Sequence, residues 1–444
     1  MRRKVIALLL ILALSGSVFY GCSSLKKAAA SQPMNGKDII EHYEGTIELE
    51  EMDPAYADAQ REFAYQIFDS VEEGENTFLS PYSIAMALSM LYNGADKGTR
   101  EEMAKLLGYD LLEGYTSDYN EAANHYVNAN NSLLMRLLQA ASYSRVKLNT
   151  ANAIWLAKEG EFSDQLETAL LAPARYYYDG DIFNVDFKKE ETLKEVNQWV
   201  SKKTNGMIDP FLDGFSDPES TRVFLANAVY FNGEWKLPFE PKDTREATFY
   251  GEKEPTRVDM MHLFEEKFRY YNEGGMQGIE LPYGSGTIVM DILIPEDKQQ
   301  SIQELYEGLT SKEKDGFFGK LDKAEVKEIG TLGVPKFELE YSVDELNDIL
   351  IGMGMQEAFS RQDADFELIG KKLYVSRVTH KAMIRVEEWG TEASAATGIE
   401  VATTAALAEP PLNFIADVPF LFFIRDTATD TILFMGSMMQ PQVK

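Results

Sequence analysis

The sequence predicts an α+β fold, in which helices and strands gather in different parts of the chain, and three observations support this. The 444 residues are 45% hydrophobic and 26% charged, as in ordinary globular proteins. Apolar residues at helical spacing dominate the first half, whereas β-branched and alternating segments follow later. Strands and helices do not alternate regularly, so the pattern favours α+β over a doubly wound parallel sheet.

Residues 1–21 are predicted to be an export signal. Three cations precede an apolar run over residues 5–18, which is too short to remain as a membrane-spanning helix. The run ends in Gly21 and Cys22 and resembles the lipobox of a bacterial lipoprotein, although Phe19 stands where leucine is usual. The alternative is an ordinary secretory signal with a chance cysteine. We expect lipidation of Cys22, because free thiols are otherwise scarce in exported proteins.

Residues 22–54 are predicted to be the lipidated cysteine and a flexible acidic tether, and residues 55–444 one large domain without a second linker or repeat. Removal of the signal takes the formal net charge from −29 to −32, since it deletes three cations. This charge makes nucleic acid and heparin-like polyanions poor partners. We expect contact with the membrane through the lipid only, and a location at the cell surface or in the extracellular space.

The domain begins with helices. One is expected around residues 63–68, and another from Pro81 to about Gly94. The Asn-rich residues 120–131 are predicted to be a loop or an irregular helix edge, and residues 284–286 a hairpin turn. Strands are predicted at residues 222–231, 287–294, 336–341, 372–388 and 430–435.

The sequence contains no recognisable motif for catalysis, a cofactor or a metal. There is one cysteine, and the four histidines are widely spaced, so no zinc motif can be built. A P-loop, a nucleophile elbow and a His-Glu-x-x-His pair are also missing. The sequence has 72 acidic residues, so a glycosidase-like carboxylate pair cannot be recognised among them. An exported lipoprotein hydrolase therefore remains an alternative. We expect no cofactor and no metal.

A long segment with almost no large apolar side chain covers residues 390–414, and its sequence is GTEASAATGIEVATTAALAEPPLNF. Thr, Ile and Val favour extended structure, small residues fit between crowded neighbours, and no proline occurs before Pro410. The segment is therefore suited to become a strand. Composition alone leaves open whether it is instead a low-complexity exposed loop.

Seven segments follow one another in an order typical of a known family: residues 78–103, 151–156 (ANAIWL), 196–208, 227–239 (NAVYFNGEWKLPF), 354–359, 380–390 and 417–436. With these motifs the chain resembles the serpin superfamily across residues 55–442. The resemblance implies a serpin-like fold, with several helices packed on three β-sheets and an exposed reactive-centre loop at about residues 388–418. It also implies that the chain is not an enzyme. Met207 departs from the usual basic residue, which changes the surface only.

The resemblance implies a suicide inhibitor of serine proteases, or of cysteine proteases. A protease cuts the loop and forms an acyl-enzyme, and the freed loop inserts as a new strand of the main sheet before water releases the enzyme. We therefore expect a monomer with a metastable fold and an open slot in that sheet. The alternative is a non-inhibitory serpin that acts as a binding protein.

The hinge of the loop has the small residues of inhibitory members. We expect Thr391 to enter the sheet early, with its side chain in the packed interior, and Glu392 to point away from it. The hinge residues are Glu388, Gly390, Thr391, Glu392, Ala393, Ser394, Ala395 and Ala396.

The scissile bond is expected between Thr404 and Ala405, which is seventeen residues from Glu388 counted inclusively. Cleavage elsewhere within residues 401–407 remains open. The absence of a cation there argues against trypsin-like enzymes, whereas the shallow pocket of an elastase or subtilisin accepts Thr, Ala or Val.

The resemblance also implies a polar cluster under the main sheet that controls how readily the sheet opens. Each member has a structural explanation too, such as helix capping by Ser80 and core packing by Trp235, which is expected where the loop enters. The residues are Ser80, Ser83, Asn227, His380 and Trp235.

Overall fold

The computed structural model describes five stretches of the chain. The signal, Cys22 and most of the tether fall outside them and stay predictions. The described residues are 51–71, 75–141, 145–343, 346–391 and 412–441. Within them, no helix is long and apolar enough to cross a membrane.

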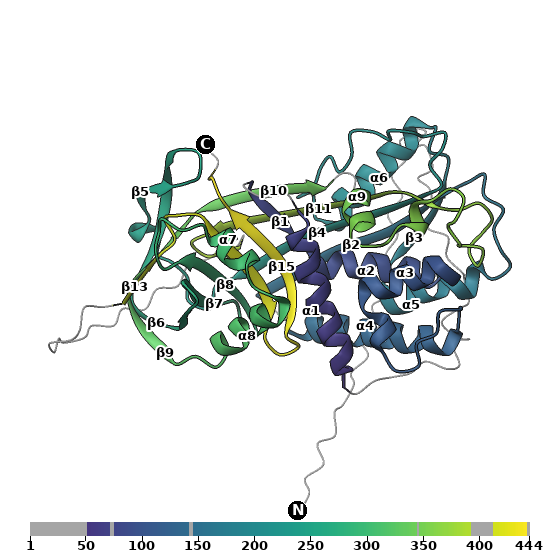
Figure 1. Cartoon of the computed structure of the whole chain (residues 1–444). Coiled ribbons are helices and arrows are strands. Elements are labelled where there is room, and N and C mark those ends of the chain that lie inside the picture. Colours follow the sequence, from purple (N-terminus) through teal and green to yellow (C-terminus); the bar gives the residue numbers. More distant parts are fainter. Residues whose placement is uncertain (1–50, 72–74, 142–144, 344–345, 392–411, 442–444) are drawn as a thin grey trace, which may run out of the picture. The chain divides into compact units, whose positions relative to one another are not determined.

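Nine α-helices are found in this part of the chain (Figure 1). α2 is central, because all of its residues are buried. It starts as its sequence predicts: the Ser80 side chain accepts a hydrogen bond from the Ser83 N–H, and Pro81 occupies the first turn. The helices are α1 (Pro54–Asp69), α2 (Pro81–Tyr92), α3 (Lys97–Leu107), α4 (Glu121–Ala141), α5 (Ala172–Tyr178), α6 (Glu190–Lys203), α7 (Ile302–Glu307), α8 (Ser311–Leu321) and α9 (Asn347–Gly352).

The smaller sheet has six strands and lies between helices on both faces (Figure 1). Val196 and Val200 of α6 pack with Trp155 and Phe224 on one face, and α2 packs on the other. Burial of both faces explains why residues 223–231 of one central strand are all buried and mostly apolar. In spatial order the strands are β10 (Phe337–Val343), β11 (Val375–Glu387), β12 (Gly390–Thr391), β4 (Val223–Glu234), β2 (Val146–Ala157) and β3 (Asp181–Val185).

The larger sheet has nine strands joined through one long strand, β6. β6 pairs with β5 over residues 255–260, with β9 over residues 260–269 and with β7 over residues 269–273. The three separate sheets that the resemblance implied are therefore two in this structure, because β6 runs through both halves of the larger one. The strands are β1 (Thr77–Leu79), β5 (Arg245–Tyr250), β6 (Pro255–Glu273), β7 (Met276–Pro282), β8 (Ile288–Pro295), β9 (Val326–Pro335), β13 (Leu412–Ile415), β14 (Phe420–Asp426) and β15 (Thr431–Met438).

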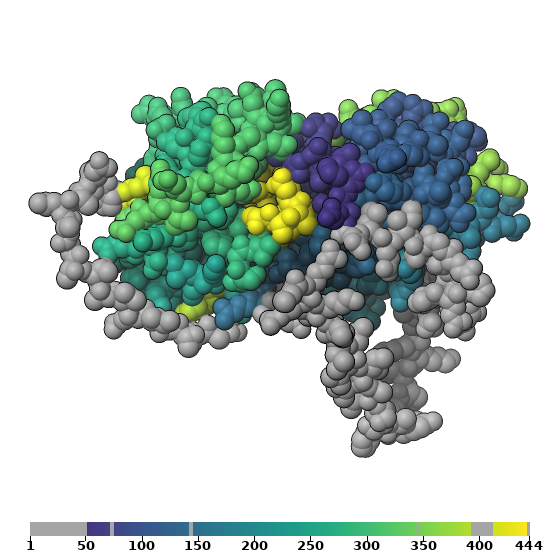
Figure 2. All heavy atoms as spheres, turned by 90° about the horizontal axis from the view of Figure 1, so that it is seen from below, coloured from purple at the N-terminus to yellow at the C-terminus, as the bar shows by residue number. Residues whose placement is uncertain are grey.

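The first helix connects the helical region to the C-terminal strands. α1 contacts both α2 and β15. Figure 2 shows its purple surface between the blue helical segments and the yellow C-terminal segment. The main core cluster accordingly continues from Phe63 and Ile67 of α1 to Leu433 of β15.

The α+β prediction is confirmed, and so are the five predicted strands, which correspond to β4, β8, β10, β11 and β15. The hairpin turn at residues 284–286 is confirmed as well, since it joins the paired strands β7 and β8. The prediction for residues 120–131 is wrong, because residues 121–131 belong to α4. Asn is a poor helix former, but Asn128 and Asn131 are buried there and bonded to the Tyr178 hydroxyl.

Candidate functional site

Two of the hinge residues, Gly390 and Thr391, already lie inside the six-stranded sheet. Thr391 of β12 stands opposite Val386 of β11 and Gly233 of β4, and Gly390 stands one register step away. β12 runs antiparallel to both neighbours. The rest of the hinge, residues 392–396, and the expected scissile bond at residues 404–405 lie outside the described residues.

Beyond β12 the sheet is closed. β4 and β11 pair directly and in parallel, from Val375 opposite Val223 to Met383 opposite Tyr230. The expectation of an open slot is therefore wrong. The strands on either side of the insertion position satisfy each other's backbone groups, so a new strand has to separate them first.

Glycine is required at position 390 by both conformation and space. Gly390 has φ +146°, and a Cβ there would lie 2.1 Å from the carbonyl oxygen of Gly233. Any side chain would push β12 away from β4. The glycine thus allows the hinge to approach the neighbouring backbone closely.

The Thr391 side chain is fully buried and points at an aromatic pair. Its Oγ1 lies 2.8 Å from the Tyr283 hydroxyl. The Tyr283 ring stacks on Trp235, with centroids 4.2 Å apart and planes 12° apart. Trp235 in turn donates from Nε1 to the Glu387 carbonyl at 3.0 Å, so the pair contacts both sides of the hinge.

Glu388 is held at the beginning of the hinge by an ion pair. Its carboxylate lies 2.8 Å from Lys336 Nζ and accepts a hydrogen bond from the Thr244 hydroxyl, also at 2.8 Å. Burial acts to raise the pKa of Glu388, but the hydrogen bonds and the nearby lysine outweigh it and lower the pKa. Glu388 is therefore a charged anchor at the point where the loop leaves β11.

The four polar residues expected under the sheet form one hydrogen-bonded cluster. His380 Nε2 accepts from the Ser80 N–H at 3.2 Å, so Nδ1 carries the proton and donates to Asn227 Oδ1. The Asn227 amide donates to Ser83 Oγ at 2.6 Å and also contacts Asn152. Burial lowers the pKa of His380 to about 3, so the ring is neutral at physiological pH.

This cluster bridges the two strands that must separate. His380 of β11 and Asn227 of β4 are direct neighbours across the parallel ladder. Moving the strands apart breaks the bond between their side chains and leaves buried polar groups unpaired, which is costly. The arrangement stabilises the closed sheet.

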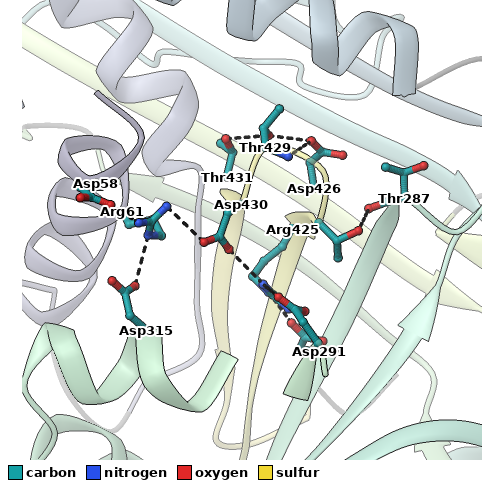
Figure 3. Close-up of polar contacts among 12 residues, drawn as sticks. Asp58, Arg61, Thr287, Asp291, Asp315, Arg425, Asp426, Thr429, Asp430 and Thr431 are labelled. Carbon is teal, nitrogen blue, oxygen red and sulfur yellow. Dashed lines mark hydrogen bonds and ion pairs between the residues drawn. The ribbon is translucent and has the colours of Figure 1, made fainter. Parts of the chain in front are cut away.

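A second polar cluster lies in the larger sheet and joins it to α1 and α8 (Figure 3). Arg425 is 1% exposed, and its guanidinium group pairs with Asp291 at 2.5 Å, Asp322 at 2.8 Å and Asp430 at 3.5 Å. Arg61 of α1 reaches Asp430 from the other side at 3.2 Å. Because every charge has an opposite partner, the cluster acts as a structural link.

Two buried carboxyl groups, Asp291 of this cluster and Glu280 beside it, have raised pKa values. Glu280 stands directly opposite Asp291 on the next strand, and Arg269 Nε lies 3.4 Å from it. Burial, and then the charge of Asp291, raise the pKa of Glu280 to about 7. Burial also raises the pKa of Asp291 to about 6, although Arg425 acts to lower it.

The comparisons with known proteins agree with this geometry. The sequence profile described as Serpin (serine protease inhibitor) matches residues 58–441. The chain belongs to the serpin family. This serpin is 31% identical to an uncharacterized serpin-like protein of Thermococcus kodakarensis over 449 residues, with 100% of both chains covered. It is 34% identical to the leukocyte elastase inhibitor of Sus scrofa over 395 residues, which cover 86% of this chain and 98% of that protein.

Solved structures show the same fold. The thermophilic serpin tengpin in its native state has a TM-score of 0.79 and 28% identity, with 92% of this serpin and 99% of tengpin covered. Uncleaved ovalbumin has a TM-score of 0.74 and 26% identity, with 87% of this serpin and 100% of ovalbumin covered. Serpins are mostly inhibitors and not catalytic enzymes, which agrees with the lack of a catalytic motif.

Sequence reasoning missed three residues that hold the hinge of this serpin: Tyr283, Thr244 and Lys336. Each contacts a hinge residue from a distant part of the chain, and Tyr283 and Thr391 are 108 positions apart. The only local signal is the position of Tyr283 at the predicted hairpin turn. Among the residues that the structure describes, no group of three or more His, Cys, Asp or Glu side chains could hold a metal ion.

Proposed function

We propose that this serpin is a suicide inhibitor of serine proteases, or of cysteine proteases, that acts as a monomer outside the cytoplasmic membrane. The observation that carries the proposal is the position of β12 between β4 and β11. A loop that continues from Thr391 along this line becomes a strand with a partner on each side. The hinge therefore points the loop at the place where inhibition requires it.

The proposed reaction starts when the protease nucleophile attacks the carbonyl carbon of Thr404. The bond to the nitrogen of Ala405 breaks, the amine leaves with a proton, and Thr404 stays bound to the enzyme as an ester or thioester. Residues 392–404 are then free at one end and follow β12 into the sheet. Deacylation stalls once the enzyme is distorted, since each oxyanion-hole donor is worth about 3 to 4 kcal/mol.

Insertion exchanges one ladder of hydrogen bonds for two. The direct parallel pairing of β4 with β11 is lost, and the new strand pairs antiparallel with both. For about fourteen inserted residues, the added bonds give on the order of 10 kcal/mol before ordering entropy is subtracted. Parallel pairing is also slightly weaker per residue than antiparallel pairing. Both effects favour the inserted state, and the bond between His380 and Asn227 opposes early opening.

The proposed targets have a shallow primary pocket, as in elastase or subtilisin. Small residues around Thr404 suit such a pocket, and the similarity to the leukocyte elastase inhibitor of Sus scrofa supports the same class. The proposed location is the cell surface, through a lipid on Cys22.

A protease panel tests the proposal. The protein is incubated with elastase, subtilisin, trypsin and papain, and each mixture is run on a denaturing gel and assayed for residual protease activity. We expect a covalent complex and loss of activity with elastase or subtilisin. The inhibitor assignment is wrong if these enzymes cut the loop without forming a covalent complex, or if no enzyme loses activity. A non-inhibitory binding protein is then the better interpretation.

A further inference from the structure

The hinge strand β12 is paired on both sides through its backbone but makes few side-chain hydrogen bonds. It contains two residues, and Gly390 has no side chain. Among the described residues, the bond between Thr391 Oγ1 and the Tyr283 hydroxyl is the one side-chain hydrogen bond that β12 makes. Backbone pairing of two residues alone is weak, because strand ends open easily. The side-chain bond therefore adds to the backbone pairing of β12 and to the backbone bonds that Trp235 and Phe239 donate to the residues just before it.

Tyr283 is fixed before it meets Thr391. Its own N–H donates to the Ile288 carbonyl, and the next N–H, of Gly284, donates to the Glu234 carbonyl, both at 2.8 Å. The ring is fully buried and stacks on Trp235. The hydroxyl is thus presented at one place, without the entropy loss of ordering a mobile side chain.

A missing side chain on β4 makes room for this ring. A Cβ on Gly233 would lie 2.9 Å from Tyr283 Cδ1, so the ring occupies the space under that glycine. Gly233 is also the β4 residue opposite Thr391. The tyrosine therefore reaches the hinge from beneath the point where the hinge pairs with β4.

We propose that Tyr283 is a positioning residue that holds the hinge in the sheet through its hydroxyl. The bond favours the state in which Thr391 is inserted over the state in which β12 has left the sheet. This role rests on the proposed function. When Thr391 is already in the sheet, the loop has one residue fewer to insert before deacylation. Loss of one buried hydrogen bond predicts a roughly fivefold shift toward the open hinge.

Hydrogen exchange of the intact protein measures directly how often β12 leaves the sheet, and it needs no protease. Exchange at the amides of residues 390–391 is compared, by mass spectrometry, in the parent, Tyr283→Phe, Thr391→Val and the double variant. We expect each single variant to exchange about fivefold faster at the hinge, and the double variant to match the singles, because both changes remove the same bond. Thr391→Ser keeps a hydroxyl and should behave like the parent.

The matched control is Tyr92→Phe. The Tyr92 hydroxyl is buried and makes no hydrogen bond within the described structure, so its removal should leave hinge exchange unchanged. Unchanged hinge exchange in Tyr283→Phe, or effects of the two single variants that add in the double variant, would overturn the proposal.

A second measurement separates this inference from the proposed function. In the protease panel, Tyr283→Phe should raise the moles of serpin consumed per mole of protease inactivated by up to about fivefold. Faster hinge exchange with no covalent complex in the parent would support the hold by Tyr283 and contradict the inhibitor assignment. If the parent forms the covalent complex but Tyr283→Phe changes neither the consumption ratio nor the hinge exchange, the inhibitor assignment is supported and the role of Tyr283 is contradicted.

Discussion

Replacing Thr391 with arginine is the sharpest test of insertion at this hinge. The Thr391 side chain is 0% exposed, with its hydroxyl against Tyr283 and its backbone between two strands. An arginine there must either bury its guanidinium group in this apolar and aromatic surrounding or leave the sheet. In the first case insertion carries the cost of an unpaired buried charge, and in the second the loop loses its starting position.

The expected size of the effect follows from the cost of an unpaired buried charge. That cost is about 3 to 5 kcal/mol in proteins. Each 1.36 kcal/mol in a barrier changes a rate tenfold, so insertion slows by roughly two to four orders of magnitude if the whole cost is felt at the barrier. The expected scissile bond at Thr404 is unchanged, so acylation should proceed normally. Deacylation then finishes first, and the variant becomes a substrate.

The assay is the number of moles of serpin consumed per mole of protease inactivated. This ratio should rise from near one in the parent to many in Thr391→Arg, and stay near one in the conservative control Thr391→Ser. The second control, Thr404→Arg, should keep the ratio low and shift the preference toward trypsin-like enzymes. If Thr391→Arg still traps protease stoichiometrically in a denaturant-resistant complex, the insertion route assigned to this hinge is wrong.

Three further predictions concern the anchor, the metastable fold and pH. The native chain should begin at Cys22 with a diacylglycerol on its sulfur; mass spectrometry of the membrane fraction measures this, and an unlipidated secreted chain would contradict it. Nicking the loop within residues 401–407 should raise the melting temperature by tens of degrees, because the freed loop inserts; an unchanged value would mean that it does not. Glu280→Gln should be close to the parent in stability at pH 4 and exceed it by up to about 3 kcal/mol at pH 8. The reason is that the unfolded chain releases the Glu280 proton near the ordinary pKa of about 4.3, whereas the folded chain keeps it up to a pKa of about 7, so the parent loses stability between these two values; urea unfolding at both pH values measures this, and an equal difference at both would refute it.

Local sequence was enough to predict the elements that bury a regular apolar pattern. The five predicted strands are present, and α2 begins at Pro81 after its Ser80 cap. These features depend on neighbours within a few positions, where turn residues, caps and side-chain periodicity act. The small residues of the hinge were visible for the same reason, since their ability to fit into a crowded sheet is a property of each residue alone.

The tertiary structure decided which distant residues meet, and no local pattern in the sequence predicts those contacts. The helix at residues 121–141 exists despite its asparagines, because buried tyrosines from other segments bond to them. The hinge is already in the sheet while β4 and β11 are closed beyond it, which depends on strand register and not on composition. Tyr283 and Thr391 meet across 108 positions for the same reason: cross-strand neighbours are set by how strands far apart in the chain pair, and only the folded backbone fixes that pairing.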